Sequence, residues 1–313
     1  MAVFKGTKNF YDYEASDILA QNLHQFLDHG LVEIGAFTNI TFSNSATSGY
    51  TTLKRVYDDR YGKNRVFEGI GAGWVWESGI SLVGSTDYPF HVSGVYVGNQ
   101  FIPNSSSGIF SFNVDYRNGR IVFNNSIPAG SGVKCEYSAK DVNVQVVDSK
   151  QWKTIITKYE ESFNSLASNS PSGMAEILKQ DRAYLPALFV AVNDRNTKGF
   201  QLGGGELTTY YVDFYTFADK PFQNRRLLDL LNNQQEVVLN LYNINNSPKV
   251  FNYDGTLSSG ALTYPALATK TSPYFWSFAR IDKSTGGPRE AKYDIFRGLV
   301  TQEITIERNP SSY

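Results

Sequence analysis

The chain has 313 residues, enough for about two domains at a usual size of roughly 150 residues each. Its 29 Lys and Arg side chains balance 30 Asp and Glu side chains, which excludes a uniformly charged surface of the kind that grips nucleic acid or anionic membrane. A single cysteine excludes an intrachain disulfide framework. The abundance of Tyr (20) and Phe (21) favours β-strands and wide interfaces.

The N-terminal stretch MAVFKGTKNFYDYEA has no apolar core of the kind found in signal peptides. No run in the chain approaches the ~18 apolar residues that a membrane-spanning helix needs. We therefore expect a protein that has no membrane partner and that folds or assembles in a cytoplasm.

The first predicted element is a helix over residues 12–29. Apolar residues recur in it at helical spacing, acidic residues crowd its start, and Gly30 suits the position just after its end. The apolar stripe consists of Ile18, Leu19, Leu23, Phe26 and Leu27. Further along, the Gly- and Trp-rich segment VFEGIGAGWVWESGISLVG is typical of a strand with bends. Residues 1–85 are therefore predicted to form an N-terminal helix and strands.

The clearest hairpin signal is the pair Asn118-Gly119, between two strands in residues 112–123. Asn-Gly is the preferred pair for a two-residue type I′ turn, in which both residues have positive φ. Because a β-branched side chain is strained at positive φ, the substitution Gly119→Val is expected to cost about 1–2 kcal/mol.

This two-residue turn predicts which residues of the hairpin are buried. The predicted cross-strand pairs are Arg117 with Arg120, Tyr116 with Ile121, and Val114 with Phe123. The two arginines then lie at an exposed tip, and Val114 and Tyr116 face the core. Alternation of apolar and polar residues resumes after the hairpin, so residues 86–150 are predicted to form a β-sandwich-like domain with hairpins.

Residues 151–313 combine apolar runs with one helical pattern. The predicted order is strand 187–192, strand 206–218, helix 220–232, and strand regions 236–244 and 293–308. This order indicates a sheet with a helix on one side. The fold class predicted for the whole chain is therefore α+β, with an N-terminal helix, a β-sandwich-like domain and a mixed sheet.

The predicted helix 220–232 has an apolar and a charged side. Its leucines are expected to pack on the helix's own sheet: Leu227, Leu230 and Leu231. Its charged residues lie on other faces: Arg225, Arg226 and Asp229. Three interpretations of these charges remain open, namely contact with a neighbouring subunit, contact with DNA, and a solvated surface.

Residues suited to metal binding or nucleophilic catalysis are few. His24 and His29 are five apart on the predicted helix, too far out of register to chelate one metal ion, and His91 stands alone. Cys135 alternates with apolar residues and is predicted to be an inert core residue.

The glycine-rich motifs also lack the context that chemistry requires. GIGAG (69–73) is followed by Trp74 and not by a helix start, and LGGGE (202–206) has no following Lys-Ser/Thr. Neighbouring acids such as Asp58 and Asp59 would serve a glycosidase only if folding placed two carboxylates within roughly 5–10 Å. We therefore expect no enzyme activity, no cofactor and no metal.

Two segments resemble bacteriophage proteins. VYVGNQFIPNSSSGIFSFNVDYRNGRIVFNNSIPAGSGVKCEY resembles a strand-and-turn cassette of tailed-bacteriophage virion proteins. The layout from ALFVAV to EVVLNLYNI is similar to that of phage tail-terminator proteins, which form an α+β unit that closes into a ring. The second half of the chain, 151–313, is accordingly expected to be a terminator-like domain.

This resemblance implies a structural protein of the virion, assembled in the host bacterial cytoplasm. It would form a ring, a hexamer or a dodecamer, at the head-to-tail neck or at the head-proximal end of the tail. As a tail terminator or collar it would contact connector or neck proteins and tail tube or sheath proteins, with DNA only in passage.

Two alternatives remain open. One is another virion component, such as a baseplate, fibre-base or decoration protein. The other is a carbohydrate- or receptor-binding β protein, in which Trp74, Trp76 and Tyr88 would stack on sugar rings.

Overall fold

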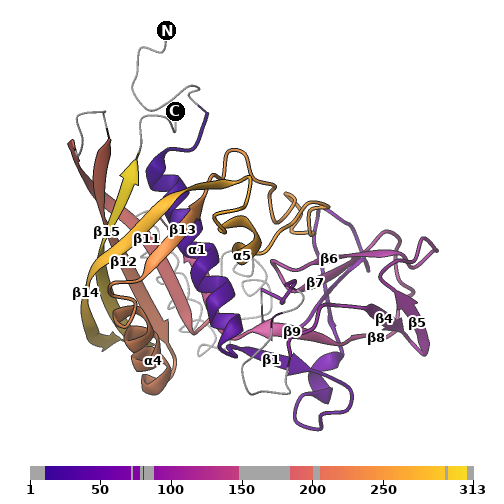
Figure 1. The fold of residues 1–313 in the computed structure, drawn as a ribbon. Coiled ribbons are helices and arrows are strands. Elements are labelled where there is room, and N and C mark those ends of the chain that lie inside the picture. Colours follow the sequence, from indigo (N-terminus) through magenta and orange to yellow (C-terminus); the bar gives the residue numbers. More distant parts are fainter. Residues whose placement is uncertain are drawn as a thin grey trace. The chain divides into compact units, whose positions relative to one another are not determined.

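The computed structural model describes residues 11–71, 73–77, 80, 88–147, 184–199, 205–292 and 295–308. The described chain is α+β, as predicted, with an N-terminal helix and several β-sheets (Figure 1). It forms two compact units. Unit 1 comprises Met1–Asp28, Asn143–Ser247 and Tyr264–Tyr313, and unit 2 comprises His29–Val142 and Pro248–Thr263. Both units are discontinuous in the chain, whereas the ranges expected from the sequence, 1–85, 86–150 and 151–313, were continuous.

Helix α1 (Ala15–Glu33) is the predicted N-terminal helix, but it runs past Gly30. Leu31 and Val32 are buried, so their packing continues the helix beyond the predicted end. The helix ends instead at Gly35, which has φ +90°. The amide of Gly35 donates to the carbonyl of Val32, and that of Ala36 donates to the carbonyl of Leu31. This pair of bonds is a Schellman motif, in which glycine supplies the left-handed residue.

The described part of unit 1 is built on a mixed sheet of six strands. Their order is β10 (Asn143–Val146), β11 (Ala187–Gly199), β12 (Glu206–Ala218), β15 (Ile295–Arg308), β14 (Phe275–Lys292) and β13 (Val238–Tyr242). Strands β10 and β11 are parallel, and the other neighbouring strands are antiparallel. A short helix, α5 (Tyr264–Leu267), precedes β14. The predicted mixed sheet is therefore confirmed.

Helix α1 contacts both edge strands of this sheet. The Asn22 side chain accepts a hydrogen bond from the Tyr242 amide on β13 (2.9 Å) and donates one to the Tyr242 carbonyl (2.9 Å). The His24 ring lies 3.1 Å from the carbonyl oxygen of Val144 on β10. Because one helix reaches both edges, the sheet is curled around it.

Helix α4 (Pro221–Asn232) packs on one face of the sheet, over β12, β14 and β15 (Figure 1). Its buried residues are Asn224, Leu227, Leu228 and Leu231. Leu228 thus takes the place that the sequence pattern assigned to Leu230, which is half-buried. Asn224 ties the helix to the sheet, because its side chain accepts a bond from the Thr216 hydroxyl (2.7 Å) and donates one to the Arg297 carbonyl (3.0 Å).

Gly298 on β15 lets α4 lie close to the sheet. A Cβ atom at this position would lie 2.6 Å from a methyl carbon of Leu228 and would also clash with the Thr216 hydroxyl. We expect Gly298→Val to lower the free energy of unfolding by roughly 1–3 kcal/mol, because overpacking forces neighbouring side chains and backbone to shift. Urea unfolding would measure the change. The matched control is Gly287→Val on β14, where an added Cβ meets nothing within 4 Å. Equal midpoints for the two variants would contradict this account of the packing.

The strands that the structure describes in unit 2 form three small antiparallel sheets. The first has the strand order β2 (Lys54–Val56), β3 (Val66–Glu68), β7 (Arg120–Phe123) and β6 (Phe112–Asp115). The second has the order β5 (Gln100–Pro103), β4 (Gly94–Val97) and β8 (Val133–Cys135). The third pairs β1 (Phe37–Ile40) with β9 (Tyr137–Lys140). A short 3₁₀ helix, η1, covers Ser48–Thr51. One hydrophobic core collects residues from all three sheets, and Cys135 lies in it, fully buried.

The segment Pro248–Thr263 belongs to unit 2 although it follows β13 of unit 1 in the chain. Thr256 forms a β-bridge with Asp115 at the end of β6. Phe251 packs against the core and makes an edge-to-face contact with Trp76. Unit 2 is therefore completed by residues far from its strands in sequence.

Candidate functional sites: the hairpin network and the outer face of helix α4

The hairpin of β6 and β7 turns at Asn118 and Gly119, as predicted, but not with a two-residue loop. The register pairs Asp115 with Arg120 and Val114 with Ile121, so the loop comprises residues 116–119. Of these four loop residues, Gly119 alone has positive φ, at +66°. The predicted type I′ turn is therefore wrong.

The Asp115 side chain explains the wider loop. Its carboxylate accepts hydrogen bonds from the Asn118 amide (3.0 Å) and from the Asn118 side chain (2.7 Å). The loop also accepts three backbone bonds from the neighbouring segment, from Gly69 to Gly119, from Gly73 to Arg117 and from Trp74 to Tyr116. These contacts hold Asn118 outside the left-handed region that a type I′ turn requires.

Burial in the hairpin follows the prediction at three of four positions. Val114 and Tyr116 are buried and Arg117 is exposed, as expected. Arg120 was expected at an exposed tip, yet it is only 6% exposed. The cause is the register, which places Arg120 on the strand opposite Asp115 and points its guanidinium at two carboxylates.

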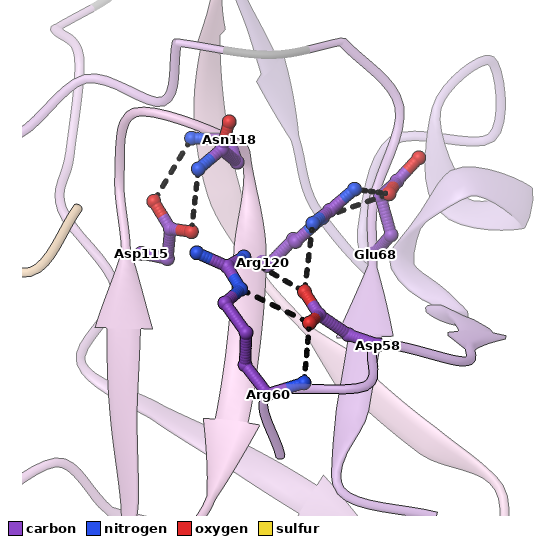
Figure 2. A network of polar contacts seen from close by, with 6 residues as sticks. All are labelled: Asp58, Arg60, Glu68, Asp115, Asn118 and Arg120. Atoms are coloured by element: carbon purple, nitrogen blue, oxygen red, sulfur yellow. Dashed lines mark hydrogen bonds and ion pairs between the residues drawn. The ribbon is translucent and has the colours of Figure 1, made fainter. Parts of the chain in front are cut away.

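Figure 2 shows the polar network around Arg120. Its guanidinium lies 2.9 Å from a carboxylate oxygen of Glu68 and 3.5 Å from one of Asp58. Asp58 also accepts bonds from the Arg60 guanidinium, at 3.0 Å and 2.7 Å, and from the Arg60 amide at 3.1 Å. Two arginines thus hold the loop after β2, the strand β3 and the hairpin together.

The two aspartates of this region have opposite pKa shifts. The hydrogen bonds from Arg60 lower the pKa of Asp58, whereas burial raises the pKa of Asp115. Such divergence is typical of acid–base pairs in active sites. Here, however, Asp58 and Asp115 are 5% and 1% exposed, and a Cβ at Gly255 would collide with the Asp115 carboxylate. A substrate has no access to these groups while Gly255 stays in place, so the network fastens the hairpin to its neighbours.

Of the cysteine and the histidines considered for chemistry, His91 is exposed, and the other three are buried or in contact with a strand. Burial raises the pKa of the Cys135 thiol, in keeping with the predicted core residue. His24 contacts β10 and His29 is buried. Within the described ranges, no group of three or more His, Cys, Asp or Glu side chains is placed to hold a metal ion.

The aromatic residues proposed for sugar stacking do not form a platform. Trp74 is 1% exposed and stacks on Tyr137, with ring centroids 4.1 Å apart. Trp76 packs on Phe251, and only Tyr88 is well exposed, at 50%. The expectation that Trp74 stacks on a sugar ring is therefore wrong, because its ring is part of the unit 2 core.

A different aromatic cluster lies at the surface of unit 2. Tyr96 on β4 contacts Phe101 on β5 and Phe42, with ring centroids 5.1 Å and 5.4 Å away. Phe101 and Phe42 are 46% and 40% exposed. Sequence reasoning missed this cluster because Phe42 is more than fifty residues from Tyr96 and Phe101. The only local signal was Tyr96 and Phe101 flanking the turn at Gly98.

The outer face of helix α4 presents the predicted charges to solvent. Arg225, Arg226 and Asp229 are exposed, and their side chains have no hydrogen-bond or ion-pair partner in the described part of the chain. Phe222 is 63% exposed on the same face, one helical turn before the arginines. The sequence pattern did not single out Phe222. This aromatic and cationic face, Phe222, Arg225, Arg226 and Asp229, is called the outer face of α4 below.

Comparison with known proteins does not assign the chain to a family. No family model matches it, and no characterised protein is significantly similar in sequence. In the described part of the chain, no helix is both long and apolar enough to cross a membrane.

Proposed function

We propose that the protein is a structural virion subunit that forms a ring at the head-to-tail neck, or at the head-proximal end of the tail, of a tailed bacteriophage. As a tail terminator or collar, it completes the tail and joins it to the connector. It is assembled in the host cytoplasm and then resides in the virion. It does no catalysis and needs no cofactor.

The observation that carries this proposal is the outer face of α4. An exposed phenylalanine beside two arginines without partners is the composition of an interface, because Phe and Arg are enriched in protein contacts. The helix itself is anchored on its sheet by the buried side chains Asn224, Leu227, Leu228 and Leu231. A rigid helix with an unpartnered face suits repeated contact between identical subunits.

A ring requires each subunit to present two different surfaces to its neighbours, so that the contact closes by rotation. The predicted partners are further copies of the chain, six or twelve in a ring, together with connector or neck proteins and tail tube or sheath proteins. DNA passes through the ring without being gripped, in keeping with the balance of 29 basic and 30 acidic side chains.

The second candidate function is carbohydrate or receptor binding. It is favoured by the exposed cluster of Phe42, Tyr96 and Phe101, because aromatic rings supply much of the contact surface for sugars and receptor proteins. Binding of the purified monomer to a glycan array, with no ring formed in the presence of virion partners, would favour this candidate over the first.

The ring proposal predicts that Arg225→Glu combined with Arg226→Glu leaves the subunit folded but prevents ring formation. Both side chains are exposed, so the fold loses little, whereas like charges at an interface cost several kcal/mol per contact. Circular dichroism would check the fold, and native mass spectrometry would measure the ring.

The matched control is Lys54→Glu combined with Arg117→Glu, which makes the same change in net charge at exposed positions of unit 2. The control is expected to keep its rings. Intact rings in the α4 variant would show that this helix is not part of the ring interface. A wild-type protein that stays monomeric in the presence of connector and tail proteins would contradict the proposed function.

A further inference from the structure

A second surface of unit 1 has the composition that complements the outer face of α4. Residues 11–17, YDYEASD, contain three carboxylates and no basic residue. All three acids, Asp12, Glu14 and Asp17, are exposed. Tyr11 and Tyr13 are exposed as well, by 86% and 52%. This stretch is called the acidic segment below.

The acidic segment is fixed on unit 1 although its side chains are exposed. The Tyr13 amide donates to the side-chain oxygen of Asn245 (2.8 Å), and the Asn245 side chain donates to the Tyr13 carbonyl (3.1 Å). Glu14 lies 3.7 Å from Arg195 on β11. The backbone is therefore held in place while two tyrosines face solvent, so a partner would find the segment already ordered.

The two surfaces lie toward opposite ends of the six-stranded sheet, so one subunit does not join them to each other. The acidic segment is beside Arg195, which pairs with Tyr210 of β12, whereas α4 is bonded to Thr216 of the same strand. The six steps along the strand from Tyr210 to Thr216 span about 20 Å at the usual rise per residue. Figure 1 likewise shows the start of α1 and helix α4 far apart.

We propose that the outer face of α4 binds the acidic segment of a second copy of the chain. Arg225 and Arg226 would pair with Asp12 and Glu14 of the neighbour, and Tyr11 and Tyr13 of the neighbour would cover Phe222 and the arginine planes. Charge complementarity selects this occupant: in the acidic segment every charge is negative, and the arginines have no partner in the described part of their own chain. Tyrosine and arginine also form favourable cation–π contacts.

This contact joins two different surfaces, and is therefore the head-to-tail kind that closes a ring. The inference rests on the proposed function and specifies it, because it names which part of the neighbour each α4 helix meets. A C2 dimer, in which the same patch meets itself, would place arginines of both copies together and is disfavoured by repulsion.

A charge-swap experiment tests the contact on the full-length protein. Three variants are compared by native mass spectrometry: Arg225→Glu with Arg226→Glu, Asp12→Arg with Glu14→Arg, and all four substitutions in one chain. The first two are expected to lose the rings, and the fourfold variant is expected to recover them. The Glu14–Arg195 pair is exposed on both sides, so its loss changes stability little.

A second fourfold variant controls for net charge. It combines Arg225→Glu and Arg226→Glu with Glu33→Arg and Asp59→Arg, two exposed acids outside the acidic segment, and is expected to stay without rings. Rings in this control, or no recovery in the swapped variant, would overturn the inference and leave the proposed function standing. Absence of rings in the wild type beside its virion partners would overturn both.

Discussion

Gly119→Val is expected to lower the free energy of unfolding by about 2–5 kcal/mol, the sum of roughly 1–2 kcal/mol for the left-handed backbone and roughly 1–3 kcal/mol for overpacking. Gly119 has φ +66°, and an added Cβ would lie 2.8 Å from the indole nitrogen of Trp74 and would clash with the Gly71 carbonyl. Both neighbours belong to the segment whose amides at Gly73 and Trp74 are bonded to the hairpin loop, so neither can move freely. Denaturant unfolding monitored by tryptophan fluorescence would measure the loss.

Gly98→Val separates the two contributions. Gly98 has φ +60°, nearly that of Gly119, but nothing lies within 4 Å of an added Cβ. This variant is expected to lose only the roughly 1–2 kcal/mol of backbone strain. If both variants lost the same stability, the close approach of Gly71 and Trp74 to the turn would have no energetic importance. For Gly119→Val, the expected loss of about 2–5 kcal/mol therefore replaces the roughly 1–2 kcal/mol expected from the backbone conformation of the turn alone.

Arg120→Met is expected to cost roughly 3–5 kcal/mol, because it removes the cation between two carboxylates. The side chains of Arg120, Asp58 and Glu68 are 8%, 3% and 15% exposed, so water does not replace the lost partner. Arg60→Met is the matched control: the side chain of Arg60 is 47% exposed, and breaking a pair with one exposed partner is expected to cost much less. An equally large loss of stability in Arg60→Met would contradict the assignment of the main stabilising role to Arg120.

At acidic pH, the free energies of unfolding of the wild type and of Arg120→Met are expected to differ less than at pH 7. In the wild type the pKa of Asp58 is lowered, so its contribution to stability is present above the ordinary carboxyl pKa and is lost as the pH falls through the folded pKa. In the variant, Arg60 still pairs with Asp58 but the attraction of Arg120 is gone, so protonating Asp58 takes less stability from the variant than from the wild type. The combination Arg120→Met with Glu68→Gln, which leaves the Arg60–Asp58 pair intact, should recover part of the stability at pH 7. Unfolding curves at several pH values would check both expectations, and a difference independent of pH would contradict them.

The hairpin shows what local sequence can and cannot predict. Alternation placed Val114 in the core because side chains on a strand point to opposite faces whatever the turn, and Tyr116, the first residue of the loop, is buried as well. The turn itself depends on the Asp115 carboxylate and on backbone bonds from residues 69–74. The Asp115 bond is local, but the bonds from residues 69–74 come from a distant part of the chain, and together they override the preference of Asn-Gly for a two-residue turn. The burial of Arg120 follows from the same change of register.

The helices and the other strands also combine features that local sequence predicts with features that depend on packing. The charged side of α4 was predictable from helical spacing, whereas α1 passes Gly30 because the residues that follow it are buried. Strand β14 was not predicted at all, since Gly286, Gly287 and Pro288 interrupt its pattern. Pairing with β15 along most of its length compensates for these weak β-formers. The cluster of Phe42, Tyr96 and Phe101 required the fold before it could be seen.

Because residues 248–263 of unit 2 follow residues 143–247 of unit 1 in the chain, unit 2 cannot finish folding until after most of unit 1 has been translated. At roughly 5–20 residues per second, translation needs roughly 5–20 s to make the intervening residues 143–247. During that time Asp115 lacks the strand bridge from Thr256, and its carboxylate is not yet covered by Gly255. Closing a loop of that length then costs on the order of 4 kcal/mol of chain entropy. Unit 2 thus reaches its final form only after most of unit 1 has been synthesised, and a nascent chain released before residue 263 would carry an unfinished unit 2.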